Sequence, residues 1–317
     1  MKVTDAAQAL STNEWSAGRS YRWIAAACGA AVALVAVAFA HGSAGFKPAN
    51  GRIAFIADGG IYTIRSDGRA MRKVAGGGPR GRLGFVALAW SPDGRQLAAI
   101  EVENLYVMDG DGRNRRIVLH AGGALTGGYA SIAWSPRGDE LALGRVEPLE
   151  IELLTLATGR RRTLVRGGVF PSWTPDGRSI VYERPEQRAE SVRMIRSDGT
   201  NDHLIMREGL MPARAPDGAS VAYVGGQPNL VDLKVRRLGA GKARTLARGD
   251  VGGDVTFHYP RWAPDGAEVL ANRVLGSHTA SACCLVDLYL VPANGGRARI
   301  IRRDIDDSPV AWQPRTR

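Results

Sequence analysis

The chain has 317 residues, a formal net charge of +11 at pH 7 and three cysteines. Three cysteines are too few for a disulfide framework, so a small disulfide-stapled fold is excluded. The five histidines show no metal-ligand spacing, and we predict no metal site and no cofactor.

An uncharged segment of 18 residues, 23–40, follows a tail of 22 residues at the N-terminus. This length is at the lower end of what spans a bilayer. Arg19 and Arg22 lie immediately before it, which predicts a cytoplasmic tail and an exported remainder. Export makes nucleic acid a poor partner for the positive charge. The alternative is a cleaved signal peptide and a secreted protein, because Ala38-Phe39-Ala40 is an A-x-A cleavage sequence.

These features predict four parts. They are a cytoplasmic tail (1–22), a transmembrane helix or signal-anchor (23–40), a linker (41–50) and an extracytoplasmic domain (51–317).

The predicted domain contains a recurring motif, Trp-x-Pro followed in most copies by Asp-Gly. Its copies are AWSPDG at 89–94, AWSPRG at 133–138, SWTPDG at 172–177, ARAPDG at 213–218, RWAPDG at 261–266 and AWQP at 311–314. The fourth copy has Arg214 in the place of Trp, and the last stops after Pro314. Recurrence at this spacing indicates a repeat protein.

Each complete copy is followed by two short apolar runs, a polar hairpin signal and a third run, which together predict four antiparallel strands, A to D. Such a unit is one blade of a β-propeller. Residues 311–314 supply a strand A without its continuation, and residues 51–68 supply the continuation without a Trp-x-Pro motif. Joined, they complete one blade, so we predict an all-β fold: a six-bladed propeller closed between its two ends.

Over about residues 51–314, the Trp-Ser-Pro-Asp-Gly motif resembles the WD-like repeats of TolB-type propeller proteins. The resemblance implies a six-bladed propeller in the cell envelope that acts through protein contacts. The N-terminal α/β domain of TolB has no counterpart in this sequence, which leaves the particular role of TolB in doubt.

Two sets of residues follow from the blade pattern. The motif tryptophans are predicted to pack between blades: Trp90, Trp134, Trp173, Trp262 and Trp312. Residues about four positions earlier are predicted to line a central funnel, as a partner-binding surface: Phe85, Tyr129, Phe170, Met211, His258 and Tyr259. Packing between blades is the alternative for each funnel residue.

Arginines gather at the C–D hairpins, which share one face with the A–B turns. We predict that they approach anionic lipid headgroups: Arg113, Arg115, Arg116, Arg160, Arg161 and Arg162. The alternative is that they serve solubility only. Cys283 and Cys284 are adjacent and form either a vicinal disulfide or two thiols that are free or paired with another molecule.

No catalytic constellation or nucleophile elbow is evident, so we predict no enzyme activity. The expected function is a membrane-anchored protein-binding or scaffold module of the cell envelope. The alternative is a propeller hydrolase or lyase that acts on a cell-wall or extracellular polymer in the central funnel.

Overall fold

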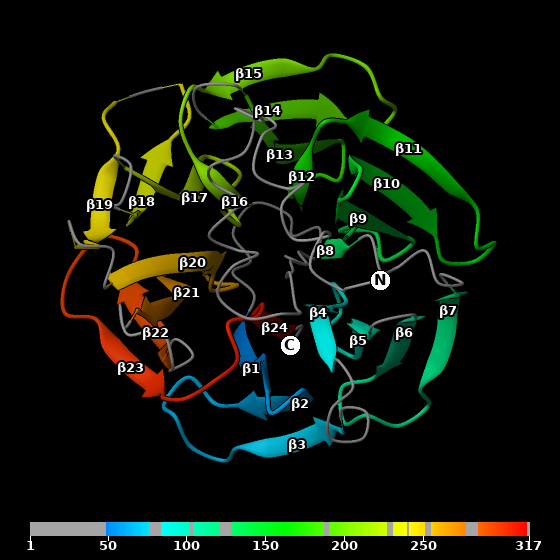
Figure 1. Cartoon of the computed structure of the whole chain (residues 1–317), viewed down its shortest axis with the longest axis horizontal. Helices are drawn as coiled ribbons and strands as arrows, with labels where there is room; N and C mark the ends of the chain where they lie inside the picture. The colour runs from blue at the N-terminus through cyan, green and yellow to red at the C-terminus, as the bar shows by residue number, and fades with distance from the viewer. Residues whose placement is uncertain are drawn as a thin grey trace, which may run out of the picture.

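The computed structural model describes residues 49–76, 84–101, 104–120, 128–186, 190–226, 231–239, 241–250, 255–276 and 285–315. These residues form 24 strands in six four-stranded antiparallel sheets, which stand around a common axis (Figure 1). The predicted six-bladed propeller is therefore confirmed. The predicted tail, the membrane segment, most of the linker and both adjacent cysteines lie outside the described residues.

The inner strand of each blade, strand A, lies nearest the axis. These strands are β24 (Ala311–Arg315), β4 (Phe85–Trp90), β8 (Tyr129–Trp134), β12 (Val169–Trp173), β16 (Leu210–Arg214) and β20 (Val255–Trp262). The B strands follow outward: β1 (Ala49–Ala57), β5 (Gln96–Glu101), β9 (Glu140–Val146), β13 (Ser179–Pro185), β17 (Ser220–Gly225) and β21 (Glu268–Leu275). Blades 1 to 6 are named here in this order.

The outer half of each blade consists of strands C and D. The C strands are β2 (Gly60–Ile64), β6 (Asn104–Asp109), β10 (Leu149–Thr155), β14 (Glu190–Arg196), β18 (Asp232–Arg237) and β22 (Leu285–Pro292). The D strands are β3 (Arg72–Ala75), β7 (Arg116–His120), β11 (Arg161–Arg166), β15 (His203–Met206), β19 (Arg244–Ala247) and β23 (Arg299–Arg302).

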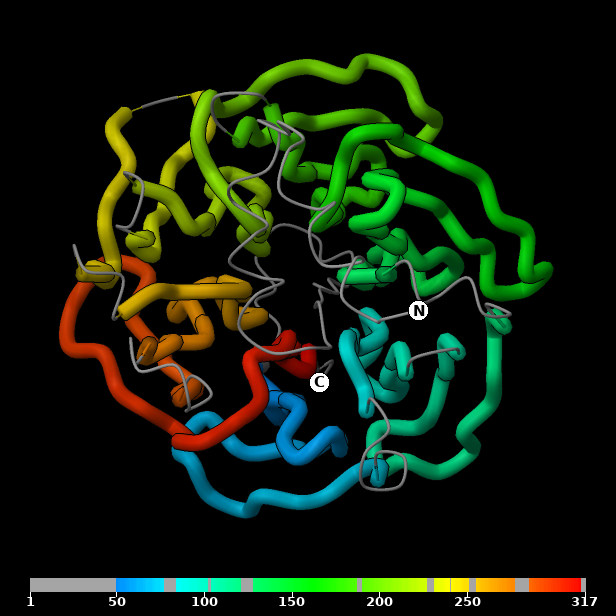
Figure 2. Tube along the Cα trace, viewed as in Figure 1, coloured from blue at the N-terminus to red at the C-terminus, as the bar shows by residue number. Residues whose placement is uncertain are grey.

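Blade 1 is built from both ends of the propeller, as the split motif predicts. β24 pairs antiparallel with β1, with Trp312 opposite Ile53, and the tube in Figure 2 shows the red and blue ends side by side. The Gln313 side chain accepts a hydrogen bond from the Arg52 amide (2.9 Å) and donates one to the Gly94 carbonyl (2.8 Å). It thereby ties the closing strand to both blade 1 and blade 2.

The Pro-Asp-Gly segments form tight A–B turns. In blade 2 the Gly94 amide donates to the Ser91 carbonyl (2.9 Å), and Gly94 has a φ of 69°, which favours glycine. The Asp93 carboxylate accepts bonds from the Ser91 hydroxyl (2.6 Å) and the Arg95 amide (3.0 Å). This aspartate therefore serves the turn, in agreement with its place in the repeat.

The A–B turns and C–D hairpins share one side of the ring, which we call the turn face. In blades 2, 4 and 6 a C–D amide donates to an A–B carbonyl: Gly110 to Arg95 (2.8 Å), Ser197 to Arg178 (2.9 Å) and Ala293 to Ala267 (2.9 Å). The B–C and D–A connections lie on the opposite side, which we call the loop face.

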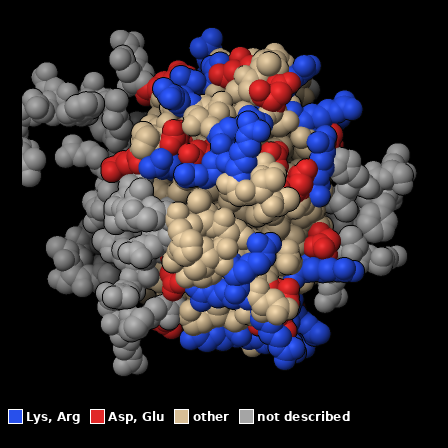
Figure 3. Space-filling view, turned by 90° about the vertical axis from the view of Figure 1, so that its right-hand side faces the viewer, with Lys and Arg blue, Asp and Glu red and all other residues tan. Residues whose placement is uncertain are grey.

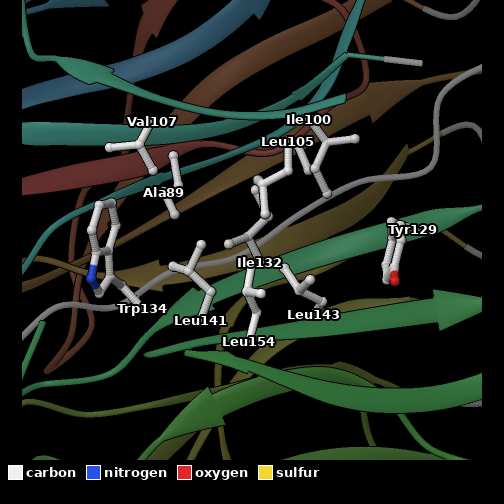
Figure 4. Close-up of a cluster of buried hydrophobic side chains, with 12 residues drawn as sticks. Ala89, Ile100, Leu105, Val107, Tyr129, Ile132, Trp134, Leu141, Leu143 and Leu154 are labelled. Carbon is white, nitrogen blue, oxygen red and sulfur yellow. The ribbon is translucent and has the colours of Figure 1, made fainter. Parts of the chain in front are cut away.

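The hydrophobic core is divided among the junctions between blades. Each of the six neighbouring pairs encloses its own buried cluster. Figure 4 shows the cluster of blades 2 and 3, where Ala89 and Val107 face Ile132 and Trp134. The five motif tryptophans are at most 6% exposed, and each belongs to one of these clusters between blades.

Arg214 occupies the tryptophan position of blade 5 and is only 9% exposed. Its Nη2 donates to the Gly218 carbonyl, whereas Nε and Nη1 have no acceptor among the described residues. Burial lowers the pKa of Arg214, and the charges of Asp217 and Asp176 act in the opposite direction. The cluster between blades 4 and 5 is the smallest of the six in the described part of the chain.

None of the described residues belongs to a helix that is long and apolar enough to cross a membrane.

We predict that Arg214→Trp raises the free energy of unfolding by about 1–3 kcal/mol, because it replaces a poorly paired buried cation with the apolar residue that the other blades use. Urea denaturation measures the change. As a control, Trp173→Ala, which opens a cavity at the neighbouring junction, should lower stability by about 3–5 kcal/mol. A destabilised Arg214→Trp variant would contradict this account of blade 5.

Candidate functional site

Three of the predicted funnel residues meet at the ring axis. Phe170, Met211 and Tyr259 come from β12, β16 and β20 and belong to one buried cluster, which we call the axial cluster. The ring centroids of Phe170 and Tyr259 are 6.3 Å apart, although their blades are not neighbours. The side chains therefore pack against each other across the axis.

A repeated β-bulge directs these side chains inward. In β12, β16 and β20 the pairing register shifts at Phe170-Pro171, Met211-Pro212 and Tyr259-Pro260. Each residue before the proline has a φ of 51–53°, a conformation that side chains other than Gly rarely adopt. A bulge re-aims a side chain, and proline needs no ladder hydrogen bond there. The three blades thus share one device that turns a side chain toward the axis.

The other predicted funnel residues lie elsewhere. Phe85 packs between blades 1 and 2, and Tyr129 packs between blades 2 and 3. Both are buried, and so are Phe170, Met211 and Tyr259 at 4% exposure or less. The prediction that these six residues line an open funnel is therefore wrong for five of them, which pack in the interior. His258 is half-buried.

Glu183 provides a hydrogen-bond acceptor for the backbone at the bulge of the next blade. This carboxylate lies on β13, is fully buried, and its Oε2 accepts a hydrogen bond from the Met211 amide (2.8 Å). The Tyr259 amide in turn donates to the Met211 Sδ (3.3 Å). Blades 4, 5 and 6 are therefore linked in sequence around the axis.

His258 forms the centre of a polar network beside the axial cluster. Its Nδ1 lies 2.8 Å from Oδ2 of Asp307, which precedes β24. Asn272 on β21 donates to Asp307 Oδ1 (3.2 Å) and to the Ser308 carbonyl (2.6 Å). The loop before β24 therefore brings Asp307 and Ser308 to the blade-6 residues His258 and Asn272.

The neighbouring Asp306 extends this network to blade 1. Its carboxylate accepts bonds from the amides of Asp58 (3.2 Å) and Gly59 (3.0 Å) in the β1–β2 turn, and its own amide donates to Ile56 (3.2 Å). The loop before β24 therefore fastens blade 6 to blade 1 on the loop face.

The network defines what His258 can do chemically. An Nδ1–H bond to Asp307 leaves Nε2 as the acceptor, and Thr256 Oγ1 lies 3.5 Å from Nε2. This arrangement suits proton transfer at Nε2. Among the described residues, no three His, Cys, Asp or Glu side chains are placed to hold a metal ion.

The arginines of the predicted basic hairpins are all exposed, but four of them make ion pairs or hydrogen bonds. Arg115 binds Glu101 (2.6 Å) and stacks on Tyr106, with its Cζ 3.6 Å from the ring centroid. Arg161 donates to the Tyr129 hydroxyl (3.3 Å). Arg162 donates to the Ser197 carbonyl of the next blade, and Arg113 pairs with Asp111, which leaves Arg116 and Arg160 as the most available ones.

Figure 3 shows the outer side of the ring on which β7 and β11 lie, where Lys and Arg side chains are numerous and Asp and Glu side chains lie among them. This surface therefore carries both positive and negative charges. Arg113, for example, lies 3.6 Å from Asp111.

Sequence reasoning did not identify Asn272, Asp306 or Glu183 as site residues. A signal for two of them is present, because Glu183 and Asn272 directly follow the buried apolar runs 180–182 and 269–271 of their B strands and are themselves buried. A buried polar residue in a strand needs a partner, which points to a role. Asp306 carries no such signal because it lies in a loop.

The arrangement of six closed blades matches solved TolB structures. TolB from Acinetobacter baumannii has a TM-score of 0.62 at 16% identity, covering 84% of this chain and 67% of that chain. Putative TolB from Agrobacterium tumefaciens has a TM-score of 0.61 at 18% identity, covering 85% and 100%. The chain has a TolB-type propeller fold.

The TolB-type propeller also resembles a chain of a nidogen/laminin complex, with a TM-score of 0.59 at 10% identity, covering 83% of this chain and 98% of that chain. Identities this low show a shared fold alone. A scan of protein-family models and a search of curated proteins found no match.

The His258–Asp307 pair makes stability depend on pH. Burial opposes the charge on His258, but Asp307 outweighs it and raises the pKa of His258 above 6.5. Burial also opposes the charge on Asp307, but His258 and Asn272 hold its pKa below 3.8. The histidine contribution is lost as pH rises through its raised pKa, and the aspartate contribution is lost as pH falls through its lowered pKa. The pair therefore stabilises most between pH 3.8 and 6.5.

We predict that Asp307→Asn lowers the free energy of unfolding by about 1 kcal/mol more at pH 5 than at pH 8.5, since both groups are partly exposed. Urea denaturation at the two pH values measures this difference. Asp304→Asn, in the same loop, is the control and should show no such dependence on pH. An equal loss at both pH values would refute the ion pair.

Proposed function

We propose that this TolB-type propeller is a protein-binding or scaffold module of the cell envelope. Residues 23–40 would anchor it in the membrane, with the propeller on the extracytoplasmic side. The observation that carries the proposal is where the chain enters the ring. β1 begins at Ala49, which pairs with Arg315, and the Asn50 side chain donates to Asp265 (2.9 Å) in the A–B turn of blade 6. The preceding chain therefore joins the propeller at the turn face.

This entry point would orient the turn face and the loop face relative to the membrane. A linker of eight residues, 41–48, spans at most about 28 Å, so a membrane helix at 23–40 would keep the turn face near the bilayer. The available arginines of that face would then meet anionic headgroups, at about 1 kcal/mol each. The loop face, with the axial cluster and the His258 network, would point away and be open to a protein partner.

A hydrolase or lyase acting on a cell-wall or extracellular polymer is the competing proposal. The His258–Asp307 pair favours it, because a histidine oriented by a carboxylate is a common general base. Turnover of a purified envelope polymer that is lost in His258→Ala would support this alternative over the binding module.

We predict that site-specific photo-crosslinking in native membranes gives a discrete protein adduct from the loop face. The positions are Asp58, Glu147 and Glu208, which are exposed in B–C and D–A connections, with Arg160 on the turn face as the control. Adducts from the three loop-face positions alone support the proposal. Adducts from Arg160 only, or from none of the four, contradict it.

We also predict that the propeller, residues 49–317, floats with anionic liposomes more than with neutral ones. The triple variant Arg113→Glu, Arg160→Glu, Arg162→Glu should lose this preference, because it reverses three exposed turn-face charges. The matched control reverses three exposed loop-face charges, at Arg207, Arg248 and Arg303, and should keep it. Equal losses in both triple variants would show that net charge, and not the turn face, determines binding.

A further inference from the structure

Blade 6 places an arginine in the interior of the propeller. Arg261 lies on the inner strand β20, between Tyr259 of the axial cluster and Trp262 of the motif, and is 1% exposed. The residue before the motif position is small in every other blade: Ala89, Ala133, Ser172, Ala213 and Ala311. A buried cation at this position is therefore peculiar to blade 6 and is not part of the repeat.

The hydrogen bonds of Arg261 leave one edge of the guanidinium unused. Nη1 donates to the Pro260 carbonyl, whereas Nε and Nη2 meet no acceptor among the described residues. The hydrogens of Nε and Nη2 point the same way, and this edge binds carboxylate, phosphate or sulfate oxygens through two parallel bonds.

Among the described residues, no carboxylate accepts a hydrogen bond from Nε or Nη2 of Arg261. Burial holds its pKa well below the ordinary range of arginine, and the Tyr259 hydroxyl acts in the opposite direction. Charged groups in protein interiors are normally paired, because an unpaired buried charge is strongly unfavourable. The described residues therefore supply no counter-charge for the buried Arg261 guanidinium.

We propose that Arg261 anchors an oxyanion in the interior of the propeller, bound side-on through Nε and Nη2. The ligand is a small solute that carries a carboxylate, phosphate or sulfate group. The site lies on the inner strand of blade 6, β20, where Arg261 follows the bulge at Tyr259-Pro260. This site is independent of the protein-binding proposal, because it concerns the interior of the ring and not its exposed loops.

Arg214 provides a matched control. It is also buried and has unpaired guanidinium nitrogens, but the charges of Asp217 and Asp176 act on it. Two nearby carboxylates repel an oxyanion, so this second arginine should not contribute to binding.

The test is the thermal unfolding midpoint of the full chain in phosphate, sulfate, acetate and chloride at constant ionic strength. We expect at least one oxyanion to raise the midpoint in a saturable way relative to chloride. A response to phosphate and sulfate assigns a tetrahedral oxyanion, and a response to acetate assigns a carboxylate.

Arg261→Met should abolish the oxyanion effect, and Arg214→Met should retain it. Arg261→Lys keeps the charge but not the two-pronged edge, so calorimetric affinity for the active anion should fall about tenfold or more. The lysine variant decides the matter if the methionine variant does not fold. Equal midpoints in all four salts, or an oxyanion effect that survives unchanged in either Arg261 variant, overturns the proposal.

Discussion

The pairing of β24 with β1 is the constraint on which the rest of the structure depends. It joins residues that are about 260 positions apart into one blade, with Trp312 opposite Ile53. Without this pairing, β1 would present an unprotected edge, and two of the six core clusters would lose their closing strand. Closure also holds the inner strands at a common axis, which is what allows Phe170 and Tyr259 to meet from non-adjacent blades.

Closure also separates the molecule into two chemically different faces. The A–B turns and C–D hairpins form the turn face, where the chain enters and where exposed arginines are available. The loop face contains the network of His258, Asp307 and Asn272, which fastens the loop before the closing strand. We favour binding over catalysis because the proposed attachment at the turn face would leave the loop face open to a partner.

The repeat predicts most of the fold because one motif defines a turn, a packing residue and a strand order at once. The site was predictable only in part. The distance from the motif tryptophan indicates that Phe170, Met211 and Tyr259 approach the axis, but the bulges that turn them into a packed cluster depend on backbone conformation. The partners of His258 depend on the path of a loop, and the contacts of Arg115 and Arg161 depend on side-chain rotamers.

The most direct test of this account is urea unfolding of a chain that ends at Val310 and therefore lacks β24. If closure holds the ring together, the truncated chain should lose the cooperative transition of the intact protein, and a peptide of residues 311–317 added in trans should restore part of it. A truncated chain that unfolds at the same urea concentration and with the same m-value as the intact protein would contradict the central role of the closing strand.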